Sequence, residues 1–236
     1  MLYRLVITES QRQDNQIILH PDQEHYLRRV VRLNDGQSFI VINGKGDGWQ
    51  VELTATGGKI ITKLEDNREL PIQVSLMVAL PKGSGFDDIV RCTTELGVSR
   101  LYPIMSDRTL LKPNENKLVR WRKIASEASE QCERLIVPYI APPLPFLEAI
   151  KQIEDNSPRF IAVARNTEKH LINHLNPLDL PSQITIATGC EGGWTTNEVQ
   201  SAIEHNFQPI TLGKRILRAV TAPIAIMSLI ASLAEK

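Results

Sequence analysis

The sequence predicts an α/β protein in two parts, a small N-terminal β-barrel at residues 1–70 and a larger α/β domain at residues 71–236. Short β-branched runs separated by turn residues fill the first part. In the second part, apolar strands alternate with helical patterns, which indicates a mainly parallel sheet with helices on both faces. The composition changes at Arg68-Glu69-Leu70-Pro71.

Five runs in the N-terminal part have strand character, and one helical segment at 21–31 interrupts them. Pro21 suits the first position of that helix. The turn signals include Asn34-Asp35-Gly36 and the glycine-rich stretch 43–48. Several short strands with one helix are typical of a small barrel. The predicted strands are 3–7, 16–19, 38–42, 49–55 and 59–64.

The C-terminal part is predicted to contain five strands, of which 72–80, 160–164 and 184–187 are buried, and four helices. Gly97 ends the first of these helices, and Thr195 with Glu198 forms a capping box at the start of the third. The predicted strands are 72–80, 101–105, 160–164, 184–187 and 208–212, and the predicted helices are 84–96, 115–133, 195–205 and 220–234.

Composition restricts the function classes. Lysine plus arginine and aspartate plus glutamate both number 27, so the formal net charge is zero. This disfavours a protein that coats nucleic acid non-specifically but allows a local basic face. Three widely spaced cysteines without a CxxC pair disfavour a disulfide framework or a zinc ribbon, and they fit the reducing cytoplasm.

Neither a membrane segment nor a metal site is predicted. The N-terminus lacks the pattern of a signal peptide. The longest apolar stretch, 219–234, contains Pro223 and is shorter than a membrane span, so it predicts a buried helix. His170 and His174 lie one helical turn apart, but no third ligand is evident nearby. A solvated surface pair is the favoured interpretation of these histidines.

Two glycine-bearing loops are the candidate ligand site. Residues 188–194 follow one predicted strand and residues 213–218 follow another. Ligands bind beyond the carboxyl ends of strands in an open parallel sheet, and glycine allows close backbone approach. The alternative for each loop alone is a plain strand-to-helix turn. Neither loop matches GxGxxG or GxxxxGK[ST], which disfavours a dinucleotide or triphosphate site.

Two groups of cations lie near these features. Lys214, Arg215 and Arg218 belong to the second loop, where they meet phosphate or pair with an acid such as Glu191. The N-terminal helix carries three arginines within about one turn, a pattern that suits RNA backbone contact or an ordinary solvated face. These three are Arg28, Arg29 and Arg32.

Five motifs in order resemble the 16S ribosomal RNA uracil-N3 methyltransferases, the RsmE family, within the SPOUT class of knotted methyltransferases. The resemblance covers almost the whole chain. The motifs are HYLRRVVRLNDGQ at 25–37, ALPKGSGFDDIVRCTTELGV at 79–98, ASEASEQCERLIVP at 125–138, TGCEGGWTTNEV at 188–199 and LGKRILRAVTAP at 212–223.

This resemblance implies a C-terminal SPOUT-type α/β trefoil-knot domain, an N-terminal PUA-like β-barrel that docks RNA, and a homodimer to which residues 220–233 contribute. It implies S-adenosyl-L-methionine as the methyl donor and 16S ribosomal RNA of the small subunit as the substrate. Carried over by motif position, the donor-binding residues are Gly189, Glu191, Gly193, Leu212, Gly213, Ile216, Leu217 and Arg218, and Ala164 and Arg165, which end an earlier strand, are expected to form a third wall.

The resemblance also suggests a mechanism. Uridine N3 must lose a proton, and an arginine near its carbonyl oxygens would stabilise the developing charge. Arg218 is the first candidate for this cation, followed by Arg134 and then Arg4. Glu191 is a candidate general base, or instead braces its loop. The target base is expected to be unstacked and to stack on Trp194 or Phe86.

Three positions depart from the family pattern. Cys190 stands where the family usually has proline, Trp194 where it has phenylalanine, and Val220 where it has glutamate. The alternatives are a SPOUT enzyme acting on transfer RNA or ribose, a non-catalytic RNA-binding or ribosome-assembly protein, and a nucleotide-binding enzyme. The enzyme prediction requires that loops 189–194 and 212–218 enclose one cleft.

Overall fold

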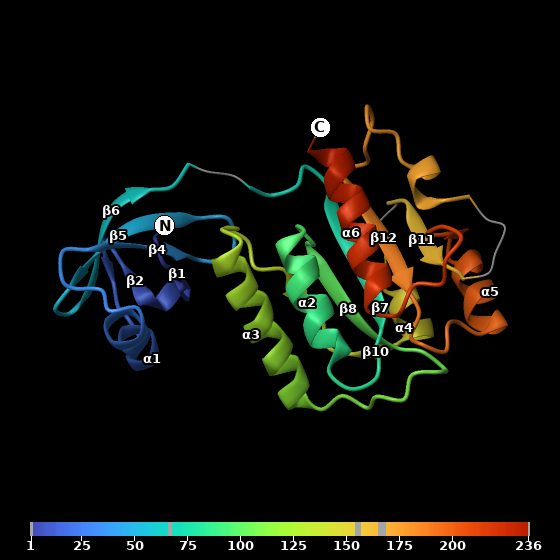
Figure 1. Ribbon diagram of the computed structural model, residues 1–236, viewed down its shortest axis with the longest axis horizontal. Coiled ribbons are helices and arrows are strands. Elements are labelled where there is room, and N and C mark those ends of the chain that lie inside the picture. The colour runs from blue at the N-terminus through green and yellow to red at the C-terminus, as the bar shows by residue number, and fades with distance from the viewer. Residues whose placement is uncertain (1, 66–67, 154–156, 165–168, 236) are drawn as a thin grey trace. The chain divides into compact units, whose positions relative to one another are not determined.

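The computed structural model describes residues 2–65, 68–153, 157–164 and 169–235 (Figure 1). The chain divides into two compact units. The first comprises Met1–Glu69 with Ser126–Val137, and the second comprises Leu70–Ala125 with Pro138–Lys236. The predicted first domain and the first unit therefore differ by one segment, residues 126–137, which lies far along the chain.

The first unit is built on a six-stranded sheet in the order β1-β4-β5-β6-β3-β2. Only β1 and β4 pair in parallel, and the other neighbours are antiparallel. All five predicted strands and the predicted helix are present. The elements are β1 (Arg4–Val6), η1 (Glu9–Gln11), β2 (Arg12–Gln13), β3 (Gln16–Ile17), α1 (Pro21–His25), η2 (Tyr26–Val30), β4 (Ser38–Ile42), β5 (Gly48–Thr54) and β6 (Gly57–Lys63).

The core of the first unit comes from period-two alternation along its strands and from the helix that covers them. Phe39 and Val41 of β4 and Val51 and Leu53 of β5 are fully buried in one cluster. Leu27, on the helical segment, joins the same cluster with no exposed surface. The helix is too short to be stable alone in water, so packing of the buried Leu27 side chain stabilises it.

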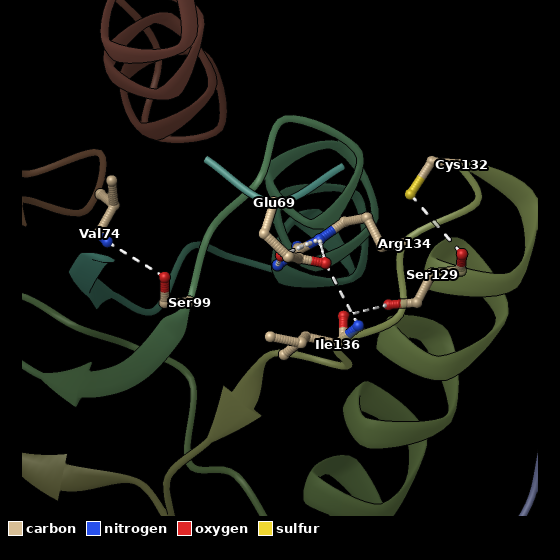
Figure 2. A network of polar contacts seen from close by, with 7 residues as sticks. All are labelled: Glu69, Val74, Ser99, Ser129, Cys132, Arg134 and Ile136. Atoms are coloured by element: carbon tan, nitrogen blue, oxygen red, sulfur yellow. Dashed lines mark hydrogen bonds and ion pairs between the residues drawn. The ribbon is translucent and has the colours of Figure 1, made fainter. Parts of the chain in front are cut away.

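Residues 126–137 are tied to the first unit by buried ionic contacts. The Arg134 guanidinium, 3% exposed, donates to both Glu69 carboxylate oxygens at 2.6–3.3 Å (Figure 2). The Ile136 amide donates to the same carboxylate at 3.2 Å. Arg4 pairs with Glu133 at 2.8 Å. These contacts join the end of a helix from the second half of the sequence to the sheet of the first half.

The second unit contains a parallel sheet in the order β10-β8-β7-β12-β11-β13, with β9 paired to β8. The predicted parallel sheet is confirmed. The elements are β7 (Gln73–Ala79), α2 (Gly85–Glu95), β8 (Arg100–Met105), α3 (Glu115–Gln131), β9 (Tyr139–Ile140), β10 (Leu144–Pro145), α4 (Phe146–Lys151), β11 (Arg159–Ala162), η3 (Leu171–His174), β12 (Gln183–Thr188), α5 (Thr196–Glu204), β13 (Phe207–Ile210) and α6 (Thr221–Ala234); the last turns of α3 belong to the first unit.

Helices cover both faces of this sheet. Along β7, six consecutive residues are buried, which requires packing on both sides. Phe146 and Ala149 of α4 and Ala202 of α5 pack against strand residues such as Met77 in one cluster. Helices α2 and α6 pack against each other and lie together in front of the strands (Figure 1).

Short elements were not predicted from the sequence. Helix α4 and the two-residue strands β9 and β10 are too brief to show a period. Within the described ranges, no helix combines the length and apolar character needed to cross a bilayer. Cys92, Cys132 and Cys190 are free thiols.

The buried Arg134–Glu69 pair leads to a stability prediction. Arg134→Met leaves the Glu69 carboxylate largely buried without its cation, which typically costs about 3–5 kcal/mol. We expect a loss of roughly this size in the free energy of unfolding, measured by urea denaturation. The double variant Arg134→Met/Glu69→Leu should recover part of the loss. A single variant as stable as the parent protein would contradict the assignment.

Glu130, near the end of α3, gives a second prediction. Its carboxylate accepts the Val6 amide at 2.6 Å, and burial raises its pKa above the ordinary value. An acid whose pKa is higher in the folded state binds its proton more tightly there, so its contribution to stability falls as pH rises through the folded-state pKa.

Glu130→Gln removes this ionisation and keeps an oxygen acceptor for Val6. We expect the variant to melt at a higher temperature than the parent protein near pH ~8, and the difference to vanish near pH ~4. Thermal unfolding across this range measures both. The same difference at both ends of the range would show that the raised pKa has no consequence for stability.

Candidate functional site

The carboxyl ends of three neighbouring strands meet at one level of the parallel sheet. Ala162 of β11 pairs with Thr188 of β12 on one side and with Ile210 of β13 on the other. The chain leaves the sheet directly after each of these residues. Three loops, including both glycine-bearing ones, therefore start side by side.

These loops enclose a pocket of about 900 Å³. Both glycine-bearing loops contribute to its lining, so the structure brings together the two segments that the sequence singled out. Nine of the ten predicted donor-binding residues line this pocket, and Arg165 lies outside the described residues. The nine are Ala164, Gly189, Glu191, Gly193, Leu212, Gly213, Ile216, Leu217 and Arg218.

Glycine is required at particular points of the first loop. A Cβ at Gly189 would lie 3.3 Å from the Gly193 backbone, so the loop folds back on itself more tightly than a side chain allows easily. Gly193 itself has φ +67°, which favours glycine, and its amide donates to the Cys190 carbonyl at 2.9 Å. The result is a turn whose backbone forms part of the pocket wall.

The first loop is braced by a buried carboxylate. Glu198, 1% exposed, accepts the Asp107 amide at 2.9 Å and the Thr195 amide at 2.8 Å. The capping box predicted for Thr195 and Glu198 is confirmed, since the Thr195 hydroxyl also accepts the Glu198 amide. The structure adds that Glu198 reaches beyond its own helix to the loop after β8.

Arg108, on that loop after β8, was not predicted from the sequence. It lines the pocket, and its guanidinium donates to the Gly192 carbonyl at 2.7 Å. A Cβ on Gly192 would lie 3.0 Å from the Arg108 side chain. Its position after the carboxyl end of a strand was the available signal, but no glycine or charge cluster marks the segment.

Glu191 belongs to the first glycine-bearing loop and lines the pocket. It is exposed, and one of its carboxylate oxygens accepts the Lys82 amide at 3.0 Å. This contact corresponds to the bracing role considered for Glu191 in the sequence analysis. It joins the first glycine loop to the loop after β7.

Cations dominate the pocket rim. Arg108, Lys214, Arg215 and Arg218 line the pocket and are exposed, whereas Glu191 is the one carboxylate residue among the described lining residues. In the described part of the chain, no ion pair joins Lys214, Arg215 or Arg218 to an acid, so the pairing considered for them is not formed. The rim is therefore suited to an anionic ligand.

One buried polar group of the pocket lining lacks a hydrogen-bond partner among the described residues. Thr188, 1% exposed, lines the pocket at the end of β12. Its Oγ1 has no hydrogen-bond partner among the described residues. A buried hydroxyl without a partner is costly, so a bound molecule that hydrogen-bonds to it would be stabilised.

Comparisons with known proteins agree with this geometry. A family model described as an RNA methyltransferase domain matches residues 68–231, and one described as an RNA methyltransferase PUA domain matches residues 21–65. The ribosomal RNA small subunit methyltransferase E of Synechocystis sp. is 44% identical, with 100% of this chain and 79% of the relative covered. The protein of that name from Bacillus subtilis is 31% identical, with 89% and 87% covered.

The chain belongs to the ribosomal RNA small subunit methyltransferase E family. The resemblance drawn from the five motifs is thereby confirmed. The crystal structure of a ribosomal RNA small subunit methyltransferase E from Neisseria gonorrhoeae, bound to S-adenosyl methionine, has a TM-score of 0.89 to this chain at 27% identity. It covers 99% of this chain, and 98% of that structure is covered in return.

The three departures from the pattern of this methyltransferase family, at Cys190, Trp194 and Val220, all lie in the pocket lining. Cys190 is 6% exposed, and its Sγ lies 3.6 Å from the Ser106 hydroxyl. Val220 lines the pocket and packs against α2, where a Cβ on Gly85 would lie 2.9 Å from its Cγ2. An apolar contact therefore occupies the position at which the family usually carries a glutamate.

The aromatic candidates for base stacking in this methyltransferase need one correction. Phe86 has no exposed surface and packs against Trp121 with ring centroids 4.5 Å apart, so the prediction that it stacks on the target base is wrong. Trp194 lines the pocket, but its indole donates to the Ala162 carbonyl at 3.2 Å and its ring packs on Phe146. Trp194 thus forms part of the pocket wall.

The predicted arginines divide between the two units. Arg218 lines the pocket of the second unit. Arg134 and Arg4 belong to the first unit and form ion pairs there, with Glu69 and Glu133. Of the three catalytic candidates, Arg218 is the one that belongs to the second unit and lines its pocket.

The three arginines of the N-terminal helix differ in their surroundings. Arg28 bonds to Glu24, Asp35 and the Thr54 carbonyl. Arg29 and Arg32 are exposed and have no ion pair within the described ranges. Two of these three guanidinium groups are therefore available to a partner.

The buried Glu198 carboxylate gives a test of the loop geometry. Glu198→Gln replaces one acceptor oxygen with an NH₂ group, which leaves an amide of Asp107 or Thr195 without its acceptor and costs about 1–3 kcal/mol. We expect this loss in urea denaturation, together with faster hydrogen exchange in loop 189–194. The control Glu204→Gln, exposed at the end of the same helix, should change stability by less than about 0.5 kcal/mol. Equal behaviour of the two variants would contradict the bracing role.

Proposed function

We propose that this methyltransferase transfers the methyl group of S-adenosylmethionine to N3 of a uridine in 16S ribosomal RNA. The main support for this proposal is the pocket lined by the two glycine loops, which has a volume of about 900 Å³ and a cationic rim. Support also comes from the 44% identical ribosomal RNA small subunit methyltransferase E and from the similar structure bound to S-adenosyl methionine.

The residues of the pocket fit this methyl donor. A volume of this size is in the range of small-molecule sites. The Thr188 hydroxyl lacks a partner among the described residues, and the glycine loops expose backbone groups that can hydrogen-bond to an adenosyl or amino-acid moiety. The rim cations suit the donor's carboxylate. We assign donor binding to the nine lining residues named above, and Arg165 remains a candidate.

The chain's own part in the reaction is to orient the uracil and to stabilise charge. When bound, the donor supplies a methyl group that its sulfonium already activates. Loss of the N3 proton spreads negative charge onto the flanking uracil oxygens, and a cation held near them lowers the barrier. We assign this role to Arg218, which is exposed at the rim and has no ion-pair partner in the described part of the chain.

The proposal extends to the assembly. We propose that residues 1–70 dock the RNA and that residues 71–236 carry out transfer, with the loops after β11, β12 and β13 forming the trefoil knot of the SPOUT class. A homodimer is proposed in which α6 contributes apolar contacts through its half-buried Ile224 and Leu229. We propose that the substrate is ribosomal RNA within the small subunit and that the reaction takes place in the cytoplasm.

Transfer of labelled methyl groups tests the proposal. The protein is incubated with labelled S-adenosylmethionine and small ribosomal subunits that lack the modification, and the modified nucleotide is mapped. Label at N3 of a uridine is the expected result. Label on a ribose or on transfer RNA would overturn the substrate assignment, and calorimetry without detectable donor binding would overturn the enzyme assignment.

The role of Arg218 is tested in the same assay. Arg218→Ala should lower kcat by about 10²–10³-fold at saturating donor, the range for loss of one charge-stabilising group. The control Arg91→Ala, on α2 and outside the pocket lining, should transfer methyl at the parent rate. Parent-level kcat in Arg218→Ala would remove this residue from the mechanism.

A further inference from the structure

We propose that the turn formed by Tyr26 to Arg32 binds an unpaired nucleotide of the RNA. The base would stack on Tyr26, and the flanking phosphates would contact Arg29 and Arg32. This rests on the proposed function and deepens it, because it states that the first unit recognises a single-stranded feature rather than duplex shape alone.

The orientation of the turn supports the proposal. Leu27 is fully buried and Val31 packs against the same core, so the face that carries these two residues points inward. The neighbouring residues Tyr26, 38% exposed, and Val30, 60% exposed, face solvent. Arg29 lies on this outer side and is also exposed. An aromatic ring, an apolar side chain and a guanidinium thus share one solvent-facing turn.

The backbone of the turn is unusual in two respects. Tyr26–Val30 is π-helical, with the Val31 amide donating to the Tyr26 carbonyl at 3.0 Å. Such turns are rare in proteins, and those that occur are often found at functional sites. Arg32, which follows the C-cap residue Val31, has φ +59°, a left-handed conformation that disfavours residues other than glycine.

The left-handed conformation of Arg32 is unfavourable for the stability of the fold, so the choice of arginine there needs another explanation. Glycine is the common residue at a left-handed position after a helix, yet this chain has a long exposed cation there. Within the described ranges its guanidinium forms no ion pair that would offset the strain. We infer that a ligand rather than the fold explains this side chain. A positive group on the same exposed turn as an aromatic ring matches phosphate and base.

Arg32→Gly tests this explanation, because it should maintain or raise thermal stability while it lowers RNA affinity. The melting temperature should stay unchanged or rise by up to about 4 °C, since the strain is relieved. Affinity for a labelled single-stranded oligoribonucleotide should fall, and the slope of log affinity against log salt should decrease by about 1. Asn206→Gly, at another exposed left-handed residue, is the matched control and should leave RNA affinity unchanged. Unchanged RNA affinity in Arg32→Gly, or a lower melting temperature, would overturn the proposal.

Tyr26 is tested separately from the cations. Tyr26→Ser should weaken single-strand binding by about 5- to 100-fold with the salt slope unchanged, whereas Tyr26→Phe should bind as the parent protein does. Blunt duplex RNA of equal length should not distinguish these variants. Equal single-strand affinity of the serine and phenylalanine variants would overturn the stacking role.

Methyl transfer distinguishes failure of this inference from failure of the proposed function. If the parent protein methylates small subunits but Tyr26→Ser and Arg32→Gly leave KM for RNA unchanged, the turn is not the docking site and the proposed function stands. If the parent protein transfers no methyl group, the proposed function fails, while the oligoribonucleotide measurements still decide whether the turn binds RNA.

Discussion

The parallel pairing of β11 between β12 and β13 is the constraint on which the candidate site depends. Because Ala162 is level with both Thr188 and Ile210, the loops that follow these strands leave the sheet at the same height. Two glycine turns, at residues 189–193 and at residue 213, therefore line one pocket. A shift of one residue in either ladder would turn every side chain to the opposite face and displace the loop after it.

Around that constraint, buried polar contacts hold the pocket wall in place. Glu198 binds amides from two separate segments, and Arg108 holds the Gly192 carbonyl. With the loop backbone fixed in this way, the rim cations Lys214, Arg215 and Arg218 remain unpaired within the described residues and keep their charge for a ligand. The combination suits methyl transfer, in which the protein mainly supplies geometry and charge stabilisation.

In the first unit, the arginines show how similar residues acquire different roles. Arg134 and Arg4 are held by Glu69 and Glu133, and Arg28 by three acceptors, so these guanidinium groups maintain the fold. Arg29 and Arg32 are exposed on the same turn as Tyr26 and remain available. This division agrees with the first unit's match to a PUA domain of RNA methyltransferases and concentrates the proposed RNA contact on one turn.

The sequence by itself determined the long elements, the parallel sheet and the two glycine loops, because period, turn residues and capping boxes are local signals. The order of five motifs also identified the family. Only the tertiary structure decided which polar and aromatic side chains are free. Phe86 is buried against Trp121, and the Arg134 guanidinium is paired with the Glu69 carboxylate. Arg108 lines the pocket from a loop that carries no recognisable motif. Burial and pairing depend on residues that are far apart in the chain. Residues 126–137, for example, belong to the same compact unit as residues 1–69, and no local pattern contains that information.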